Sequence, residues 1–402
     1  MSGTPIDYLV SRFPITSETF IVRELDALAS AGGRDIGLRS LFPSPDPQVH
    51  DIARPWVGRL VRHGAGAGLA GLWWAITRHP LTTLSIIGAV IRGYAAHPGL
   101  LARALVAVPL AAAHARDLQA AGTPRHVHAH YATYPALAAW ICARLTDITY
   151  SVTVHAHDLY VDQSMLARKL DDARFIVTVS EFNRALLKRY TSTPVHIIHC
   201  GINTAAYPFR PRQIPDSGAI RALCVASLQE YKGHRVLLQA LALGGPGVDR
   251  IELDLIGKGV LADELQALAT ELGLAERVRF LGGQSETAVK QALADADLFV
   301  LPSIVAADGQ MEGLPVALME ALASGIPTVS TDLSGIPELV IPNRTGVLAT
   351  PADPAGLRDA LEHTITAGSV LGEYAYRGRE LVEQQFDITA TTTALRELFA
   401  TL

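Results

Sequence analysis

Short apolar runs, rich in β-branched residues, alternate with longer segments of helical periodicity over most of the chain. These runs predict strands at Val127–Ala129, Tyr150–Val154, Phe175–Val179, Val195–His199, Arg221–Ala226, Ile251–Ile256, Val278–Leu281, Leu298–Leu301 and Thr328–Ser330. The segments between them predict helices at Glu181–Tyr190, Gly233–Ala242, Leu261–Leu272 and Thr287–Ala294. Because strands that alternate with helices build parallel sheets covered by helices, the pattern predicts an α/β fold.

A break in this pattern divides the chain in two. In residues 201–218, Gly201 follows a predicted strand, and Pro208, Pro211 and Pro215 lie close together, as is typical of a connector. A new series of strands and helices starts at Arg221. The sequence therefore predicts two α/β domains with a hinge between them, in line with a length of 402 residues.

The most apolar part of the chain lies between residues 64 and 113. Its runs at Gly68–Ile76, Leu81–Ile91 and Leu100–Ala113 are interrupted by Arg78, Arg92 and Arg103. A membrane-spanning helix needs about 20 uninterrupted apolar residues, so we expect short amphipathic helices instead. Two interpretations stay open, namely packing of these helices within the fold and a face that rests on a bilayer.

Composition and charge narrow the class of protein. Hydrophobic residues make up 49% of the chain and charged residues 18%, which excludes a disordered chain or a coiled coil. The net charge of −5 gives no basic excess for nucleic acid. The three cysteines are far apart and the first residues lack a signal-peptide pattern, so we expect a cytoplasmic protein without disulfides.

The densest chemical signal is the segment Asp308–Ala323, which follows the predicted strand Leu298–Leu301. Pro315 suits the first position of a helix, and Gly325 suits the residue that ends it. Gly313 and Leu314 should then lie at a helix N-terminus, where free backbone N–H groups and the helix dipole attract phosphate. Glu312 and Glu320 flank and enter this helix, and acceptor-only carboxylates bind sugar hydroxyls well. The segment predicts a site for a nucleotide sugar.

At this point the chain resembles a known family. Its segment Glu312 to Glu320 is followed by Gly325–Thr331, Ser334–Val340 and Thr345–Leu348, a series similar to the signature of the retaining, GT-B-fold glycosyltransferases of family GT4. Val225–His234 resembles their phosphate-binding loop. Ser11–Pro14 and Ser17–Ile21 resemble the exopolysaccharide (colanic acid type) subgroup. The resemblance covers nearly the whole chain and implies two Rossmann-like domains that face each other across a cleft.

The resemblance also implies roles for the residues at the matching positions. Lys232 would contact the donor diphosphate. Many relatives carry a second cation at this site, an Arg, at the position that Ser227 occupies in this chain. His155 would lie beside the transferred sugar. Glu312 would hold the sugar ring, and Glu320 the ribose. We therefore expect His155, Glu312 and Lys232 to be the catalytic residues.

Further donor-binding residues are implied in the same way. Gln284 lies in the loop that holds the base in relatives, and Ser11, Arg12 and Phe13 would form the loop after the first strand. With Glu320, Gly313, Leu314 and Ser227, they complete the expected donor site. Ser180 is expected to cap a helix. His128 and His130 should lie at a neighbouring strand end and have no carboxylate or Cys at a typical ligand spacing, so we expect no metal site.

The expected domains are residues 1–200 with a helical segment at 50–120, residues 201–375, and a C-terminal helix at 376–402 that crosses back to the first domain. The expected function is transfer of a sugar, without a metal or other cofactor, from a nucleotide diphosphate sugar to a carbohydrate or lipid-linked acceptor in exopolysaccharide biosynthesis. A peripheral contact of residues 64–113 with the inner face of the plasma membrane is part of this hypothesis. The alternatives are a nucleotide-sugar epimerase or hydrolase, and a non-catalytic nucleotide-sugar-binding protein.

Overall fold

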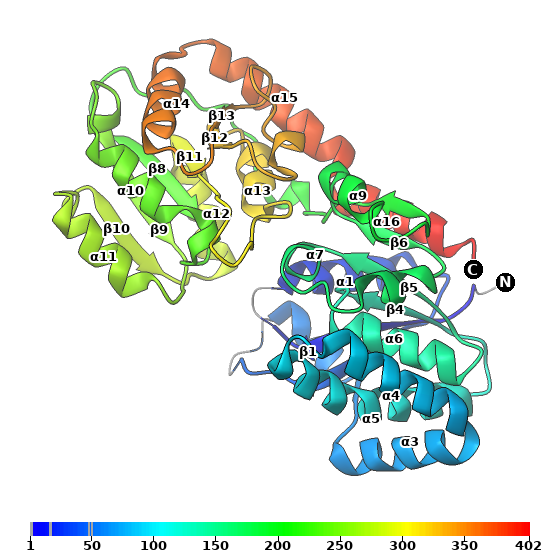
Figure 1. Cartoon of the computed structure of the whole chain (residues 1–402). Helices are drawn as coiled ribbons and strands as arrows, with labels where there is room; N and C mark the ends of the chain where they lie inside the picture. The colour runs from blue at the N-terminus through cyan, green and yellow to red at the C-terminus, as the bar shows by residue number, and fades with distance from the viewer. Residues whose placement is uncertain (1–2, 16–17, 47–48, 50) are drawn as a thin grey trace. The chain divides into compact units, whose positions relative to one another are not determined.

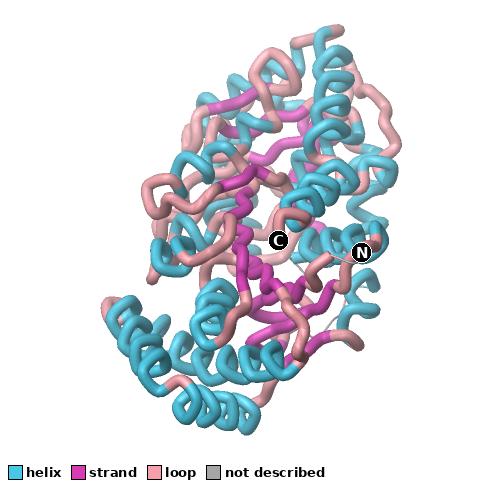
Figure 2. Tube along the Cα trace, turned by 90° about the vertical axis from the view of Figure 1, so that its right-hand side faces the viewer, coloured by secondary structure: helices cyan, strands magenta, loops and turns pink. Residues whose placement is uncertain are grey.

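The computed structural model of the chain describes residues 3–15, 18–46, 49 and 51–402. The chain forms two compact units, one made of residues 1–198 and 392–402 and the other of residues 199–391. Figure 1 shows the order of the helices and strands along the chain. Figure 2 shows strands in the interior of each unit and helices over them.

The first unit contains a parallel sheet of seven strands in the order β3-β2-β1-β4-β5-β6-β7. The strands are β1 (Ile6–Phe13), β2 (Ile36–Pro43), β3 (Leu60–Arg62), β4 (His126–His130), β5 (Thr149–Val154), β6 (Ile176–Thr178) and β7 (Val195–Ile197). Its helices are α1 (Thr19–Ala31), α2 (Arg54–Val57), α3 (Ala65–Arg78), α4 (Pro80–Tyr94), α5 (Pro98–Ala120), α6 (Tyr134–Leu145), α7 (His157–Tyr160), α8 (Leu166–Asp171) and α9 (Glu181–Leu187).

The second unit contains a parallel sheet of six strands in the order β10-β9-β8-β11-β12-β13. The strands are β8 (Ile220–Val225), β9 (Ile251–Ile256), β10 (Val278–Gly282), β11 (Leu298–Leu301), β12 (Thr328–Thr331) and β13 (Val347–Ala349). Its helices are α10 (His234–Ala242), α11 (Ala262–Glu271), α12 (Glu286–Asp295), α13 (Val316–Ser324), α14 (Pro354–Thr366) and α15 (Val370–Gln385), and α16 (Ile388–Phe399) follows.

Both sheets have the strand order of a Rossmann fold, in which the order reverses beside the first strand. The reversal lies between β1 and β4 in the first unit and between β8 and β11 in the second. Ligands of such sheets bind outside the carboxyl ends of the strands at this switch point. The α/β fold class predicted from the sequence is confirmed, and the topology selects two places where a site should be sought.

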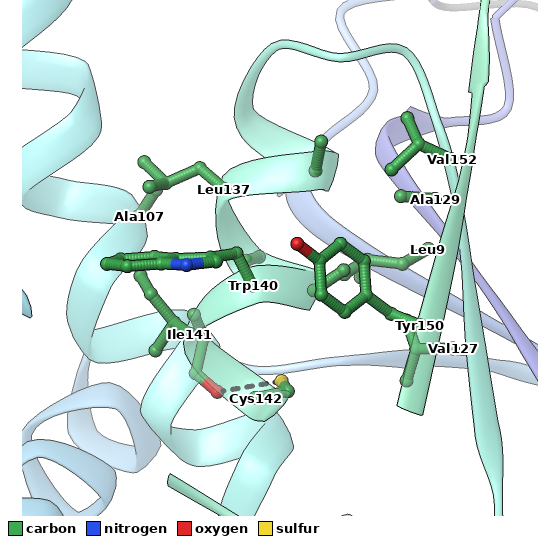
Figure 3. Packing of buried hydrophobic residues seen from close by; sticks show 14 of the residues in the cluster. Leu9, Ala107, Val127, Ala129, Leu137, Trp140, Ile141, Cys142, Tyr150 and Val152 are labelled. Atoms are coloured by element: carbon green, nitrogen blue, oxygen red, sulfur yellow. Dashed lines mark hydrogen bonds between the residues drawn. The ribbon is translucent and has the colours of Figure 1, made fainter. Parts of the chain in front are cut away.

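Hydrophobic residues cover both faces of the first sheet. On one face, Trp140 and Cys142 of α6 pack with Tyr150 and Val127 of the sheet (Figure 3), and the Cys142 thiol donates to the carbonyl oxygen of Ala111 in α5 at 3.5 Å. On the other face, α1 packs with β1 and with the end of α16, whose Leu395 and Phe399 are buried. Residues from 392 onward thus complete the core of the first unit.

The apolar segment forms three helices, and the third differs from the prediction. Arg103 was expected to interrupt the run Leu100–Ala113 and to leave only short helices, yet α5 continues through it and is 23 residues long. The reason is that arginine is a good helix former, so one charged side chain interrupts the apolar pattern without breaking the helix. By length and composition α5 could cross a membrane, but half of its apolar stretch is buried in the first unit. Within the described residues, no other helix meets that criterion.

The second unit extends further along the chain than the predicted boundary at residue 375. It reaches Thr391, and α15 packs against α13 within it. Gly378 of α15 makes this close approach, because a Cβ atom there would lie 3.0 Å from Leu322. The contact between the two helices therefore places α15 in the second unit.

Candidate active site

Two loops meet at the switch point of the second unit. The first follows β8 and contains the short 3-10 helix Glu230–Lys232, and the second follows β11 and contains Glu312. The ammonium of Lys232 donates to the Glu312 carboxylate, and both side chains are largely buried. These are two of the three residues that the sequence assigned to catalysis, and the fold brings them into contact.

The backbone holds this pair in place. Gly233 has a φ of +73°, and a Cβ atom there would lie 1.8 Å from the carbonyl oxygen of Pro302, so only glycine fits where the two loops pass. The N–H of Ile304 donates to the carbonyl oxygen of Tyr231 at 2.8 Å. The Tyr231 ring also lies under the Lys232 ammonium, 4.9 Å from it. The loop after β8 is therefore fixed directly to the loop after β11.

Burial of Lys232 would lower its pKa, but Glu312 and then Tyr231 outweigh that effect and raise the pKa above its ordinary value. Lys232 thus carries a positive charge at neutral pH. A buried ammonium at a strand end is a suitable partner for phosphate. This charge is already compensated by Glu312, so that an incoming diphosphate would meet a cation that is held in position.

The helix α13 begins next to this pair. Pro315 is its N-cap residue, with an extended ψ of 118°, and Val316 is the first helical residue. The prediction that Pro315 opens the helix is therefore wrong by one position, because its extended ψ keeps it outside the first turn. Gly313 and Leu314 are buried just before the helix, and Ser334 donates to the carbonyl oxygen of Glu312 at 2.5 Å. Gly325 ends the helix with a φ of +80°, which confirms its predicted role.

Glu320 lies within α13, and its carboxylate is mostly buried. It accepts a hydrogen bond from the Tyr207 hydroxyl at 2.6 Å. Ser227 lies half-buried in the loop after β8, where the N–H of Leu228 donates to the carbonyl oxygen of Lys258. Gln284 follows β10, and its side chain is exposed. The expected donor-binding residues of this unit therefore all follow the carboxyl ends of its strands or lie in α13.

At the switch point of the first unit, Arg12 and Phe13 differ from the prediction. They were expected in a loop after the first strand, but they form the end of β1, because pairing with β2 continues to Phe13 and Pro43. The Phe13 side chain is buried in the core, whereas Arg12 is exposed and lies 5.7 Å from the Phe42 ring. Of the two, only Arg12 presents its side chain to solvent.

His155 follows β5, and its position is fixed by two neighbouring side chains. The buried Asp158 carboxylate accepts from the backbone N–H groups of His155, Ala156 and Ala132, which joins the ends of β5 and β4. Asn183 of α9 donates to the carbonyl oxygen of His155 at 2.5 Å. Ser180 caps α9 by accepting from the N–H of Asn183, which confirms the predicted cap.

The strand β4 carries a row of three buried histidines, His126, His128 and His130, on one face. Hydroxyl groups of β5 join them: Ser151 Oγ lies 2.7 Å from both His126 Nε2 and His128 Nδ1, and Thr153 Oγ1 lies 2.8 Å from His128 Nε2. Burial lowers the pKa of His126 to about 3 and that of His128 well below its ordinary value. These two side chains are therefore neutral at physiological pH.

His130 extends the row to His155 and to a residue that the sequence did not single out. Its Nδ1 lies 3.1 Å from His155 Nε2, and its Nε2 lies 3.1 Å from Glu24 Oε1. Glu24, His128 and His130 also place one ligand atom each within 4.8 Å of one another, a donor set that could hold a metal ion. The sequence showed no carboxylate at a ligand spacing from His128 and His130. In the structure, Glu24 of α1 provides one.

A pocket of about 500 Å³ opens beside these strand ends in the first unit. Arg12, Arg103 and His157 line it together with the carboxylate of Asp162, and Leu100 and Val106 give it an apolar wall. It is suited to a ligand that has both a polar and an apolar part.

Glu24 could not be identified as a site residue from the sequence. It lies 106 residues before His130, and nothing in its local pattern distinguishes it from a solvated carboxylate on a helix. The repeat of histidine at alternate positions 126, 128 and 130 was the available signal, because alternate residues of a strand share one face. That repeat indicates a buried row of imidazoles, and buried imidazoles require hydrogen-bond partners.

Two family models match the chain. The glycosyl transferases group 1 model matches residues 209–380, and the glycosyltransferase family 4 model matches residues 60–206. The amylovoran biosynthesis glycosyltransferase AmsK of Erwinia amylovora is 36% identical over 183 residues. The match covers 46% of this chain and 45% of that relative, so the chain spans about half of its length. WcaL of Salmonella typhimurium, a glycosyltransferase assigned to colanic acid biosynthesis, is 26% identical over 99% of this chain and 100% of its own length.

The solved structures agree with the fold. HepE of Anabaena, in complex with UDP-glucose, matches 99% of this chain and 100% of its own with a TM-score of 0.72 and 16% identity. At this identity the likeness concerns the fold alone, which is that of a GT-B glycosyltransferase. Together, the two family models, the sequence relatives and the two Rossmann-like sheets lead to one conclusion: the chain belongs to the family 4 glycosyltransferases of the exopolysaccharide-biosynthesis type and has the GT-B fold.

Proposed function

We propose that this glycosyltransferase moves a sugar from a nucleoside diphosphate sugar to a glycan acceptor of a cell-surface polysaccharide, with retention of configuration and without a metal ion. The observation that carries this proposal is the buried pair of Lys232 and Glu312 at the switch point, beside the start of α13. A cation, a helix N-terminus and a carboxylate are the groups that a sugar diphosphate requires.

In this proposal, the leaving diphosphate binds between Lys232 and the N-terminus of α13. The backbone at Gly313 and Leu314 would face the phosphate oxygens, where N–H groups and the helix dipole favour negative charge. Negative charge grows on the diphosphate as the bond to the sugar breaks. Groups that are fixed before the reaction stabilise this charge without reorganising, which is the main source of rate enhancement at such sites.

The two carboxylates would bind the hydroxyl groups of the donor. Glu312 would hold the sugar ring once the diphosphate takes over part of its contact with Lys232. Glu320 would bind the ribose through its carboxylate, which also accepts from Tyr207. Ser227 would lie along the diphosphate and Gln284 along the base. The complex of the Anabaena relative with UDP-glucose supports a donor of this class.

His155 would contact a hydroxyl group of the transferred sugar. Burial, and then the neighbouring His130, lower its pKa well below the ordinary value, so that the ring is neutral. A neutral imidazole can hold a hydroxyl group without adding a charge to the site. In a front-face reaction, the leaving phosphate itself takes the proton of the acceptor hydroxyl. No carboxylate nucleophile on the opposite face of the sugar is then needed, in contrast to a retaining hydrolase.

The pocket of the first unit supports an acceptor that is linked to a lipid through phosphate. Arg12 and Arg103 provide two cations for an anionic group, and Leu100 and Val106 provide an apolar wall. The acceptor in this proposal therefore combines a sugar, a phosphate and a lipid chain.

The helices α3 and α4 support a contact with the membrane, because both expose large apolar side chains. The buried residues of α3 are all small, and Gly71 approaches α5 so closely that a Cβ atom would lie 2.4 Å from the Ala113 nitrogen, whereas α4 buries larger side chains such as that of Ile86. Toward solvent they present large apolar side chains, among them Trp73, which is 68% exposed, and Leu81, which is 81% exposed. A large exposed apolar surface marks an interaction site.

The charges around these helices favour an anionic bilayer as the partner. From residue 52 to residue 116 the chain contains seven arginines and no Asp or Glu, although the whole chain has a net charge of −5. Apolar side chains together with arginines are typical of helices that lie on anionic lipid surfaces. We propose a peripheral position on the cytoplasmic face of the membrane, where this surface meets the lipid part of the acceptor.

Product analysis tests the proposed reaction. The protein is incubated with UDP-, GDP-, ADP- and TDP-sugars and with a polyprenyl-diphosphate-linked sugar acceptor, and both the released nucleotide and the anomeric configuration of the product are determined. We expect release of one nucleotide that depends on the acceptor, with the donor configuration retained. Release without an acceptor would favour a hydrolase, and an inverted product would contradict the proposed mechanism.

A further inference from the structure

Glu24, His130 and His155 form an unbroken chain of hydrogen bonds in the first unit. Glu24 comes from α1, His130 ends β4 and His155 follows β5. The two links of the chain, from Glu24 Oε1 to His130 Nε2 and from His130 Nδ1 to His155 Nε2, are both 3.1 Å long. His130 is fully buried and His155 nearly so, and the two rings stack with their centroids 5.4 Å apart. The chain therefore joins a carboxylate to the imidazole that we place at the donor sugar.

The donors and acceptors in this chain have a fixed direction. The buried Tyr8 hydroxyl donates to Glu24 Oε1 at 2.6 Å, and burial, followed by the charge of Glu24, raises the pKa of Tyr8 well above its ordinary value. Glu24 thus accepts at this oxygen, and an ionised carboxylate has no proton to donate. His130 must therefore donate from Nε2, and when it carries a single proton its Nδ1 can only accept.

The same argument continues to the last residue of the chain. Because His130 Nδ1 accepts, the proton between the two rings belongs to His155 Nε2. A neutral imidazole holds one proton only, and in this ring that proton lies on Nε2. His155 Nδ1 is then left with a lone pair and accepts hydrogen bonds.

We propose that Glu24, acting through His130, holds His155 in the tautomer whose Nδ1 accepts a hydrogen bond, so that the site selects donor sugars that present a hydroxyl group to His155. If the sugar carried a carboxylate in place of this hydroxyl group, the lone pair of His155 Nδ1 would repel it. If the sugar lacked the hydroxyl group, His155 Nδ1 would have no hydrogen-bond partner. This inference rests on the proposed function, because it takes the contact between His155 and the sugar from it. Glu24 and His130 act as positioning residues.

The other groups around His130 fit this arrangement. His128 lies on the same strand and Glu18 precedes α1, where burial raises the pKa of Glu18 to about 7. Both ring nitrogens of His128 lie within 2.8 Å of hydroxyl groups of Ser151 and Thr153. A metal ion held by Glu24, His128 and His130 would have to displace such contacts. Stoichiometric zinc in the purified protein would therefore overturn the proposal.

Magnetic resonance of the nitrogen atoms tests the tautomer without any substrate. The full chain is labelled with ¹⁵N-histidine and measured at pH 8, and the His155 signals are identified by their loss in His155→Gln. We expect a protonated Nε2 and a bare Nδ1. In Glu24→Gln, the amide can turn its N–H toward His130 and reverse both links, so a form of His155 with a proton on Nδ1 should appear. A proton on Nδ1 in the unmodified protein would overturn the proposal.

A kinetic cycle tests whether Glu24 acts through His155. With UDP-glucose as the donor probe, Glu24→Gln should lower kcat/KM by about tenfold, the scale of one hydrogen bond to a charged group. In the His155→Gln background the same change should cause no further loss, since the two residues act as a unit. His126→Gln is the matched control, a buried histidine on the same face of β4, and it should retain the wild-type kcat/KM.

The outcomes separate the inference from the proposed function. If Glu24→Gln lowers kcat/KM equally in both backgrounds, its role is structural and the inference fails. Thermal midpoints of all variants show whether each one folds. If the unmodified protein turns over no nucleotide sugar at all, the proposed function fails, and the magnetic resonance result still decides the tautomer.

Discussion

The ammonium of Lys232 and the carboxylate of Glu312 form a buried ion pair although 80 residues separate them in the sequence. Each residue lies in the loop that follows a strand, and the two strands flank the point where the order of the second sheet reverses. The fold thus places both charges at the position where a parallel sheet binds its ligand.

We predict that Lys232→Ala and Glu312→Ala each lower turnover by more than about tenfold, because Lys232 would stabilise the charge that grows on the diphosphate and Glu312 would hold the sugar ring in place. The measurement is the initial rate of nucleotide release at a saturating donor concentration. Lys290→Ala provides a control, since it removes a lysine outside the pair. Wild-type rates in both variants would refute the assignment of this site.

The same pair predicts an effect on stability. Removal of one partner leaves the other charge buried and unpaired, at a cost of about 3–5 kcal/mol in the free energy of unfolding. The double variant Lys232→Met/Glu312→Leu removes both charges and should recover most of this loss. Denaturant unfolding of the two single variants and the double variant measures the effect. A double variant no more stable than the singles would contradict the interpretation of the pair as mutually compensating.

We predict that the first unit loses stability as the pH falls below about 6.5. Burial lowers the pKa of His126 and of His114 to about 3, whereas these groups titrate near 6.5 in an unfolded chain. The unfolded state therefore binds more protons than the folded state in this range, and each histidine costs about 1.4 kcal/mol per pH unit. Denaturant unfolding between pH 7 and pH 5 measures the slope. His126→Gln, which does not titrate, should make it shallower.

Removal of metal ions should leave the rate unchanged, because Lys232 and the start of α13 are proposed to stabilise the diphosphate. The rate of transfer is compared before and after dialysis against EDTA, and again after addition of Mg²⁺ or Mn²⁺. A loss of activity that one of these ions restores would contradict a metal-independent reaction.

The exposed apolar face of α3 and α4 should bind vesicles that contain phosphatidylglycerol and bind neutral phosphatidylcholine vesicles more weakly. Flotation of the protein with each kind of vesicle measures this. Replacement of Trp73 by Ser should lower binding and leave the thermal midpoint nearly unchanged, since the Trp73 side chain is exposed and contributes little to the core. No flotation of the unmodified protein with either vesicle would exclude the proposed membrane contact.

Much of the fold could be predicted from local patterns. The strands Ile251–Ile256 and Leu298–Leu301 were predicted with their observed bounds, because both are short apolar runs between clear helical or turn signals. The strand β1 was not delimited, and its last residues were taken for a loop. The sequence Ser11–Arg12–Phe13–Pro14 has the polar and proline residues of a turn, and only pairing with a distant strand, β2, keeps it extended.

The candidate site divides in the same way. Lys232, Glu312 and Glu320 could be found because their motifs are contiguous and carry their own helix and loop signals. Glu24 could not, because its role depends on which face of α1 turns toward the sheet, and the link from His130 to His155 could not, because it depends on the register between β4 and β5. Glu24 and His130 are 106 residues apart, and no local sequence pattern indicates that they are in contact.

The burial of Leu395 and Phe399 among the core residues of the first unit has a consequence for biosynthesis. The ribosome completes the seven strands of this unit before it makes any strand of the second, yet the residues that close its core are translated after the whole second unit. Until Leu395 and Phe399 have been translated, one apolar face of the first sheet therefore stays partly exposed to solvent. The nascent chain is then exposed to chaperones and proteases for the entire time needed to make the second unit.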